Sequence, residues 1–255
     1  LRVLWGEGMF LRPQHFQQQS LFVEVRLAEA LRLMHAHPWG IQSVAVDSDA
    51  LAAGTLHLNQ LQAVFQDGTH FDAPAADPLP LTRDLRELPQ LGVETIVHAC
   101  LPVLNAFGGN QTNDLNDTSK PVRLHASDVS VSDLYTDALE SDIATLRANV
   151  RLMFEPENRD GHLSIALVRL LKNPAGVWSV DNEFMPPAVA IGATNSLHMI
   201  VRRLLDILLV KSQALASTHR ERTKNVVEYG SSDIASFWLL HTVNRVFPLL
   251  NHMAR

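Results

Sequence analysis

Cysteine is almost absent from this chain of 255 residues, in which Cys100 is the only one. A single cysteine cannot close a disulfide within the chain, so stability has to come from a packed core. Cys100 lies in the apolar stretch Ile-Val-His-Ala-Cys-Leu-Pro-Val-Leu, which favours a small buried side chain over a reactive thiol. Such cysteine usage is typical of a reducing compartment.

An excess of basic residues is also lacking, because 21 Lys and Arg face 27 Asp and Glu and give a formal net charge of -6. Proteins that bind phosphate backbones normally carry a basic surplus, so nucleic acid is not expected as a partner. Two uncharged stretches, residues 95–113 and 184–201, reach membrane-spanning length, but prolines, glycines and asparagines interrupt both. We therefore expect a soluble protein with no direct membrane insertion.

Patterns of catalytic or metal-binding residues are missing as well. Gly6-Glu7-Gly8 lacks the rest of a dinucleotide fingerprint, and no G-x-S-x-G elbow occurs. His35 and His37 are two residues apart where a helix is about to end, so they point to different sides. The sequence predicts no catalytic residue, no cofactor and no metal. The alternative hypothesis is a β-sandwich enzyme or small-ligand-binding protein whose site lies in its loops.

The residues that are present predict a folded chain with both helices and strands. Hydrophobic residues make up 46% and charged residues 19%, which excludes disorder. A one-sided helix is predicted from Pro13 to a point before Pro38, with its apolar side chains spaced three and four apart. The residues at this spacing are Phe16, Ser20, Val23, Leu27, Ala30 and Met34, all apolar except Ser20.

From Ile41 onward the apolar period changes to two, which is typical of strands. Asp67-Gly68 provides a hairpin turn between two such runs. Further strands are predicted within residues 93–104, 122–129, 146–154, 163–171 and 177–180, with the last two paired across a turn. The predicted fold class is α+β, mainly a β-sandwich with an N-terminal helix, followed by a helical part.

The composition changes at Pro186-Pro187, which predicts a boundary between residues 1–189 and residues 190–255. Asn195 or Ser196 is expected to cap a long helix. Its heptad seam contains Leu197, Val201, Leu204, Leu208 and Leu215. The second part carries eight basic and four acidic residues, net +4, against 13 and 23, net -10, in the first.

A last helix, beginning near Ser231 after Tyr229-Gly230, is predicted to be apolar almost all round, with Ile234, Phe237 and Trp238 in its first turns. A two-helix hairpin has too little surface to cover such a helix. Either other chains bury it, or residues beyond Arg255 supply further helices, or both. We expect the first possibility to contribute, in the form of a trimer.

The string Trp5-Gly6-Glu7-Gly8-Met9-Phe10-Leu11-Arg12 is unusual because large apolar side chains and two glycines precede the first helix. It is either a tail that packs across its own sandwich or an anchor that docks on another subunit. The second reading makes Trp5, Met9 and Phe10 the apolar anchors, with Glu7 and Arg12 as their polar neighbours.

Six segments in order, WGEGMFLRPQHFQQQ, HPWGI, FQDGTHFD, RLMFEPEN, WSVDNEFMPP and SDIASFWLLHTVNRVFPLL, resemble the TssK (ImpJ/VasE) family of type VI secretion baseplate proteins. The resemblance implies a phage-like sandwich shoulder in residues 1–189 and part of a helical neck in residues 190–255, with a C-terminal head outside this sequence.

Several functional expectations come from the resemblance alone. It implies a non-catalytic structural adaptor, a homotrimer in the cytoplasm, recruited to the inner face of the cytoplasmic membrane as part of the baseplate. The shoulder would join the wedge proteins TssF and TssG, and the head would reach the inner-membrane complex of TssJ, TssL and TssM. Its closest segment is the N-terminal string, which places Trp5, Glu7, Met9, Phe10 and Arg12 on the wedge-facing surface.

Overall fold

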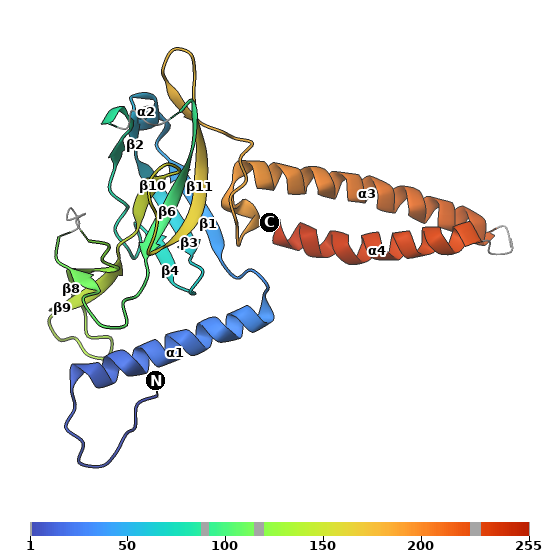
Figure 1. Ribbon diagram of the computed structural model, residues 1–255. Helices are drawn as coiled ribbons and strands as arrows, with labels where there is room; N and C mark the ends of the chain where they lie inside the picture. Colours follow the sequence, from blue (N-terminus) through green and yellow to red (C-terminus); the bar gives the residue numbers. More distant parts are fainter. Residues whose placement is uncertain (1, 88–91, 115–119, 225–230, 255) are drawn as a thin grey trace. The chain divides into compact units, whose positions relative to one another are not determined.

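The computed structural model describes residues 2–87, 92–114, 120–224 and 231–254. The chain divides into two compact units, Leu1–Ala190 and Ile191–Arg255. We call the first the sheet unit and the second the helix unit, and each is described by itself (Figure 1).

The sheet unit begins with helix α1, Pro13–Met34, and Pro13 occupies a first-turn position where its missing N–H costs nothing. Only Ala28 of this helix is buried. A Cβ added to Gly68 would lie 2.8 Å from the Ala28 Cβ, so the helix contacts the β3–β4 turn closely at this point. Nearby, Arg32 Nη2 donates to the carbonyl of Gln66 at 2.7 Å.

Two antiparallel sheets supply most of the core (Figure 1). The first has the order β1-β3-β4, formed by Gly40–Val46, Leu58–Val64 and His70–Ala73. The second has the order β10-β6-β11-β12, formed by Arg151–Phe154, Glu94–Pro102, His162–Lys172 and Trp178–Val180. Strand β1 contacts β11. The largest fully buried side chains are those of Phe65, Phe71 and Phe154.

Shorter elements complete the sheet unit. Helix α2, Ser48–Ala52, is capped by the Asp47 carboxylate, and strands β2, Thr55–Leu56, and β5, Arg83–Asp84, pair with each other. A 3-10 turn, η1, follows at Leu85–Glu87. A three-stranded sheet has the order β7-β8-β9, formed by Gln111–Thr112, Leu124–Val131 and Ser141–Ala148. The α+β fold class predicted from the sequence is confirmed.

One strand prediction was wrong, because residues 146–154 form the end of β9 and the whole of β10 rather than one strand. Between them, the Asn149 amide donates to the carbonyl of Arg123 at 2.9 Å, and Asn149 Nδ2 donates to the carbonyl of Val122 at 2.9 Å. These bonds hold the chain where it leaves the sheet of β9 and enters the sheet of β10.

The Arg123 side chain, 7% exposed, joins three of the sheets. Its Nη2 lies 2.6 Å from Asp67 Oδ2 and 2.6 Å from Thr69 Oγ1, both in the β3–β4 turn. Its Nη1 donates to the carbonyl of Pro102, the last residue of β6, at 2.7 Å. Since Arg123 directly precedes β8, one guanidinium connects the turn of the first sheet, a strand end of the second and the start of the third.

The last segment of the sheet unit, which contains Pro187 and Val189, runs alongside β1. The Ile41 amide donates to the carbonyl of Pro187 at 2.8 Å, and the Val189 amide donates to the carbonyl of Ile41 at 2.9 Å. Gly40 has φ +141°, and a Cβ there would lie 2.8 Å from backbone atoms of Pro187. A glycine is therefore required at position 40 for the strap of Pro187 to approach β1.

The helix unit contains a 3-10 turn, η2, at Ile191–Ala193, and helices α3, Asn195–Lys224, and α4, Ser231–Met253. The expected cap at Asn195 or Ser196 was wrong, because Thr194 Oγ1 accepts from the Leu197 amide at 3.2 Å. Leu205 and Val243 are buried, and Ser212 Oγ donates to Asn244 Oδ1 across the two helices at 2.7 Å. The predicted helix end at Tyr229-Gly230 lies outside the described residues.

The Arg123 contacts predict a large loss of stability on substitution. Arg123→Met should lower the free energy of unfolding by about 3 kcal/mol, because it removes one partner of a mostly buried ion pair and leaves the Pro102 carbonyl unpaired. Arg26→Met is the matched control, since Arg26 pairs with Glu29 at 2.7 Å with both side chains exposed, and it should change stability by about 0.5 kcal/mol or less. Equal losses in urea titrations of the two variants would contradict this account.

The same contacts predict a defined dependence of stability on pH. Burial by itself would raise the Asp67 pKa, but hydrogen bonds from Thr69 and the charge of Arg123 outweigh it and lower the pKa below its ordinary value of 3.8. A lowered pKa means that the stabilisation is complete above pH 3.8 and is lost as the pH falls through the pKa of the folded protein. The stability gap between wild type and Asp67→Asn should be constant from about pH 5 to 7 and narrow below pH 3.8. Urea titrations across this range measure it, and a gap that widens at acid pH would contradict the assignment.

Candidate protein-interaction surfaces

The N-terminal segment, residues 2–12, carries large apolar side chains outside the core. Trp5 is 49% exposed and Phe10 80% exposed, whereas Met9 is half-buried. The Trp5 ring lies 6.3 Å from the rings of His15 and of Phe16 on α1, measured between centroids. The structure therefore places Trp5 against the first turn of α1, and Phe10 in solvent.

The turn that leads from this segment into α1 is held by local contacts. The Arg12 amide donates to His15 Nδ1 at 3.0 Å, and Gly8 has φ +74°, a conformation that side chains with a Cβ rarely adopt. The side chains of Glu7 and Arg12 are exposed. All five residues predicted for a wedge-facing surface thus lie on one short segment, and their role in binding a wedge stays a prediction.

The apolar side of α1 is a second surface, and the sequence did not reveal that it would be exposed. Its one-sided spacing predicted a helix, but not what would cover the apolar side of that helix. In the structure, Phe16, Val23, Leu27 and Met34 are all more than half exposed. A stripe of large apolar side chains along an exposed helix is typical of a surface that another chain covers.

The seam predicted on α3 is only partly covered by α4. Leu197, Val201, Leu208 and Leu215 are half-buried, and Leu204 is 41% exposed. The side chain that is buried is that of Leu205, one position away from the predicted seam. Sequence periodicity located the apolar side of the helix but not the line that faces α4.

Helix α4 exposes all three residues predicted for an oligomer contact. Ile234 is 54%, Phe237 50% and Trp238 59% exposed. The Trp238 ring lies 5.8 Å from that of Phe237 and 5.7 Å from that of His241, between centroids. Other large apolar side chains of the helix unit are exposed as well: Met199, Ile200, Ile207, Leu209, Val210, Leu239, Leu249 and Met253.

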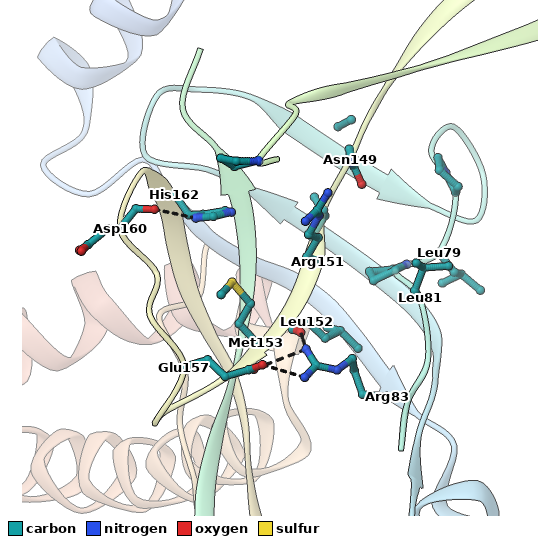
Figure 2. Close-up of a pocket in the computed structure, with 15 residues that line it drawn as sticks. Leu79, Leu81, Arg83, Asn149, Arg151, Leu152, Met153, Glu157, Asp160 and His162 are labelled. Atoms are coloured by element: carbon teal, nitrogen blue, oxygen red, sulfur yellow. Dashed lines mark hydrogen bonds and ion pairs between the residues drawn. The ribbon is translucent and has the colours of Figure 1, made fainter. Parts of the chain in front are cut away.

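A cleft of about 600 Å³ lies in the sheet unit, between β10 and the segment that precedes β5. Figure 2 shows Arg83 and Glu157 at this cleft, joined by an ion pair of 2.7 Å, with Arg83 Nη1 also donating to the carbonyl of Leu152. The opposite wall contains Pro78, Leu79, Pro80 and Leu81. Nothing in the sequence pattern indicated this cleft, because its walls are brought together only by the fold.

A hydrogen-bonded series of Ser164, His98 and Glu155 lies on β11, β6 and the residue after β10. Ser164 Oγ is 3.2 Å from His98 Nδ1, and His98 Nε2 is 2.8 Å from Glu155 Oε2. The hydrogen bond with His98 lowers the pKa of Glu155. None of the three residues lines the cleft of about 600 Å³. The cleft therefore does not provide a substrate-binding space next to this series.

The remaining chemistry of the sheet unit is limited. Burial raises the pKa of the Cys100 thiol, which keeps it protonated, as expected for a small buried side chain. Within residues 2–87, 92–114, 120–224 and 231–254, no group of three or more His, Cys, Asp or Glu is placed to hold a metal ion. No helix of the described chain is both long and apolar enough to span a membrane.

A sheet unit with exposed apolar segments, followed by a helix unit with uncovered faces, is the architecture of a subunit of a larger assembly. Residues 15–255 match the family model described as bacterial type VI secretion, VC_A0110, EvfL, ImpJ, VasE. The chain belongs to this family.

Known relatives agree with the family assignment. The chain is 32% identical over 257 residues to the type VI secretion system baseplate component TssK1 of Pseudomonas aeruginosa. The alignment covers all of this chain and 56% of that protein. The chain therefore spans about half the length of this curated relative.

Solved structures give the same result. A chain of the TssK-TssF-TssG baseplate subcomplex has a TM-score of 0.82 at 31% identity, and the match covers all of this chain and 80% of that one. A chain of the baseplate complex from the type VI secretion system has a TM-score of 0.83 at 31% identity, with all of this chain and 56% of that chain covered. The relatives are thus named as baseplate components rather than as enzymes.

Proposed function

We propose that this chain forms the shoulder and part of the neck of a type VI secretion adaptor, which connects the baseplate wedge to the inner-membrane complex. The observation that carries the proposal is the similarity along the whole chain to a structure solved together with TssF and TssG. In this proposal the chain supplies the wedge side. In this proposal the contact with TssJ, TssL and TssM belongs to the head domain that the family resemblance implies.

The role proposed for the chain is structural rather than catalytic. Large apolar side chains are exposed on the N-terminal segment, on α1 and on both long helices of the helix unit. Such surfaces suit a protein that binds other subunits. The proposed location is the cytoplasm, at the inner face of the cytoplasmic membrane, where a baseplate meets the membrane complex.

We assign the wedge contact first to the N-terminal segment, with Trp5, Met9 and Phe10 as anchors. Phe10 is 80% exposed and Trp5 49% exposed, so little of their apolar surface is used in the fold of this chain. Aromatic side chains held by a defined turn are the usual centres of binding energy in protein interfaces. Glu7 and Arg12 flank them as exposed charged neighbours.

The double variant Trp5→Ala and Phe10→Ala tests this assignment. Its binding to the cognate TssF–TssG complex should weaken by about 2 kcal/mol or more, which is roughly 30-fold in Kd, as expected for hot-spot residues. Calorimetric titration measures the binding.

The melting temperature is the control, and it should change little, because neither side chain is part of the buried core. Phe71→Ala, at a fully buried position, should instead cost roughly 3 to 5 kcal/mol of stability. A stably folded double variant with unchanged wedge binding would remove this segment from the interface.

We further propose that the helix unit takes part in a homotrimer. Leu204, Ile234, Phe237 and Trp238 are each between 41% and 59% exposed, and burying such side chains against other copies stabilises an oligomer by about 25 cal/mol per Å² of apolar surface. Val201 and Leu208, which are also on α3 near Leu204, are only half-buried.

Light scattering during size exclusion should give a trimer at micromolar concentration. Leu204→Asp and Trp238→Asp should dissociate or aggregate it, since an unpaired charge in an apolar interface costs several kcal/mol. Gln213→Asp, at an exposed polar position of α3, is the control and should keep the trimer. A clean monomer for the wild-type chain would show that other subunits do not cover these faces.

A further inference from the structure

Strand β10 is the edge strand of its sheet, and its outer backbone groups face the cleft. The Glu155 amide donates to the carbonyl of Ile96 at 3.0 Å, which fixes the alternation of the antiparallel ladder. Arg151 and Met153 therefore exchange hydrogen bonds with β6, whereas Leu152 and Phe154 direct their N–H and C=O groups away from it.

Side chains satisfy only part of this outer edge. The Phe154 amide donates to Glu157 Oε2 at 2.6 Å, and the carbonyl of Leu152 accepts from Arg83 Nη1 at 2.7 Å. Among the residues that the structure describes, no hydrogen bond joins the Leu152 amide or the backbone of Val150. Leu152 is 2% and Val150 5% exposed. Open backbone groups at the edge of a sheet that lines a cleft are a template on which a further strand can pair.

The opposite wall of the cleft does not supply such a partner, since among the described residues no hydrogen bond joins residues 78–81 to Val150 or Leu152. Residues 78–81 have the sequence Pro-Leu-Pro-Leu, and the two prolines have no N–H to donate to the carbonyls of an edge strand, so a regular ladder cannot form between the two walls. The two walls are nevertheless fixed at both ends. At one end the Ala148 amide donates to Asp77 Oδ1 at 2.9 Å, and at the other Arg83 binds Leu152 and Glu157. The gap between them is therefore held open by the fold.

The size and lining of the gap suit an extended peptide. Its volume of about 600 Å³ lies in the range of ligand-binding clefts. Leu79, Leu81 and Met153 supply apolar contact surface, and Figure 2 shows Asp160 and His162 as polar groups at the same cleft. No Phe, Tyr or Trp is among the described residues that line it, so it does not have the aromatic groove that binds polyproline helices.

We propose that this cleft binds an extended segment of a partner protein, which adds to the edge of β10 as a further strand. The added backbone would accept from the Leu152 amide and pair with the open groups of Val150, while its alternate side chains pack on Leu79 and Leu81. Resting on the proposed function, the inference names the wedge as the source of the segment. It is a second wedge contact, separate from the N-terminal segment.

Amide hydrogen exchange of the full chain, alone and with the cognate TssF–TssG complex, tests the strand addition. Exchange at Leu152 should slow about tenfold or more in the complex, because its amide gains a hydrogen bond, while Arg151 and Met153 are already bonded to β6. Protection that increases with the concentration of this chain alone would instead assign the cleft to a second copy and overturn the proposal.

A blocking substitution gives an independent measurement. Leu81→Arg places a long charged side chain in the cleft from a position that is 44% exposed, so the fold should be retained. It should weaken wedge binding about tenfold or more, whereas Leu104→Arg, at a loop position 39% exposed and outside the cleft, should leave it within about twofold.

The outcomes separate this inference from the proposed function. Wedge binding that is unaffected by Leu81→Arg, with unchanged exchange at Leu152, overturns the strand addition and leaves the adaptor role standing. Absence of wedge binding by the wild-type chain overturns both.

Discussion

The guanidinium of Arg123 is the contact on which the arrangement of the sheet unit depends. It binds Asp67 and Thr69 in the β3–β4 turn and the carbonyl of Pro102 at the end of β6, and it does so from a position that is 7% exposed. An arginine can be buried this deeply only when its donors are paired. The pairing fixes where β8 begins, and through Asn149 it also fixes where β9 passes into β10.

Because β10 enters its sheet at this point, Arg123 indirectly sets the outer wall of the cleft. The strand that follows the crossing is short, has β6 on one side only, and faces a proline segment on the other. The ion pair between Arg83 and Glu157 occupies two of its outer backbone groups. Such side-chain cover is a common way to keep an edge strand from uncontrolled pairing, and here it leaves a short stretch open.

The apolar surface of the chain is divided between folding and assembly. Phe65, Phe71 and Phe154 are fully buried and stabilise the sheet unit, whereas Phe10 and Trp238 remain largely in solvent. Exposed apolar surface of this extent is typical of a subunit, and it agrees with the membership of a baseplate family. The charged residues are also unevenly distributed along the chain, with a net charge of +4 in residues 190–255 and of -10 in residues 1–189.

Local sequence determined several elements of this protein, and tertiary structure decided which of their surfaces are free. The spacing of apolar residues from Pro13 and the Asp67-Gly68 turn correctly predicted α1 and the β3–β4 hairpin, because each depends on neighbouring residues only. Spacing could not show that Phe16 and Leu27 are exposed, that Leu205 rather than Leu204 is buried, or that the Leu152 amide has no partner among the described residues. Those properties depend on residues far apart in the sequence, such as Asp77 with Ala148 and Asp67 with Arg123, which meet only when the chain has folded.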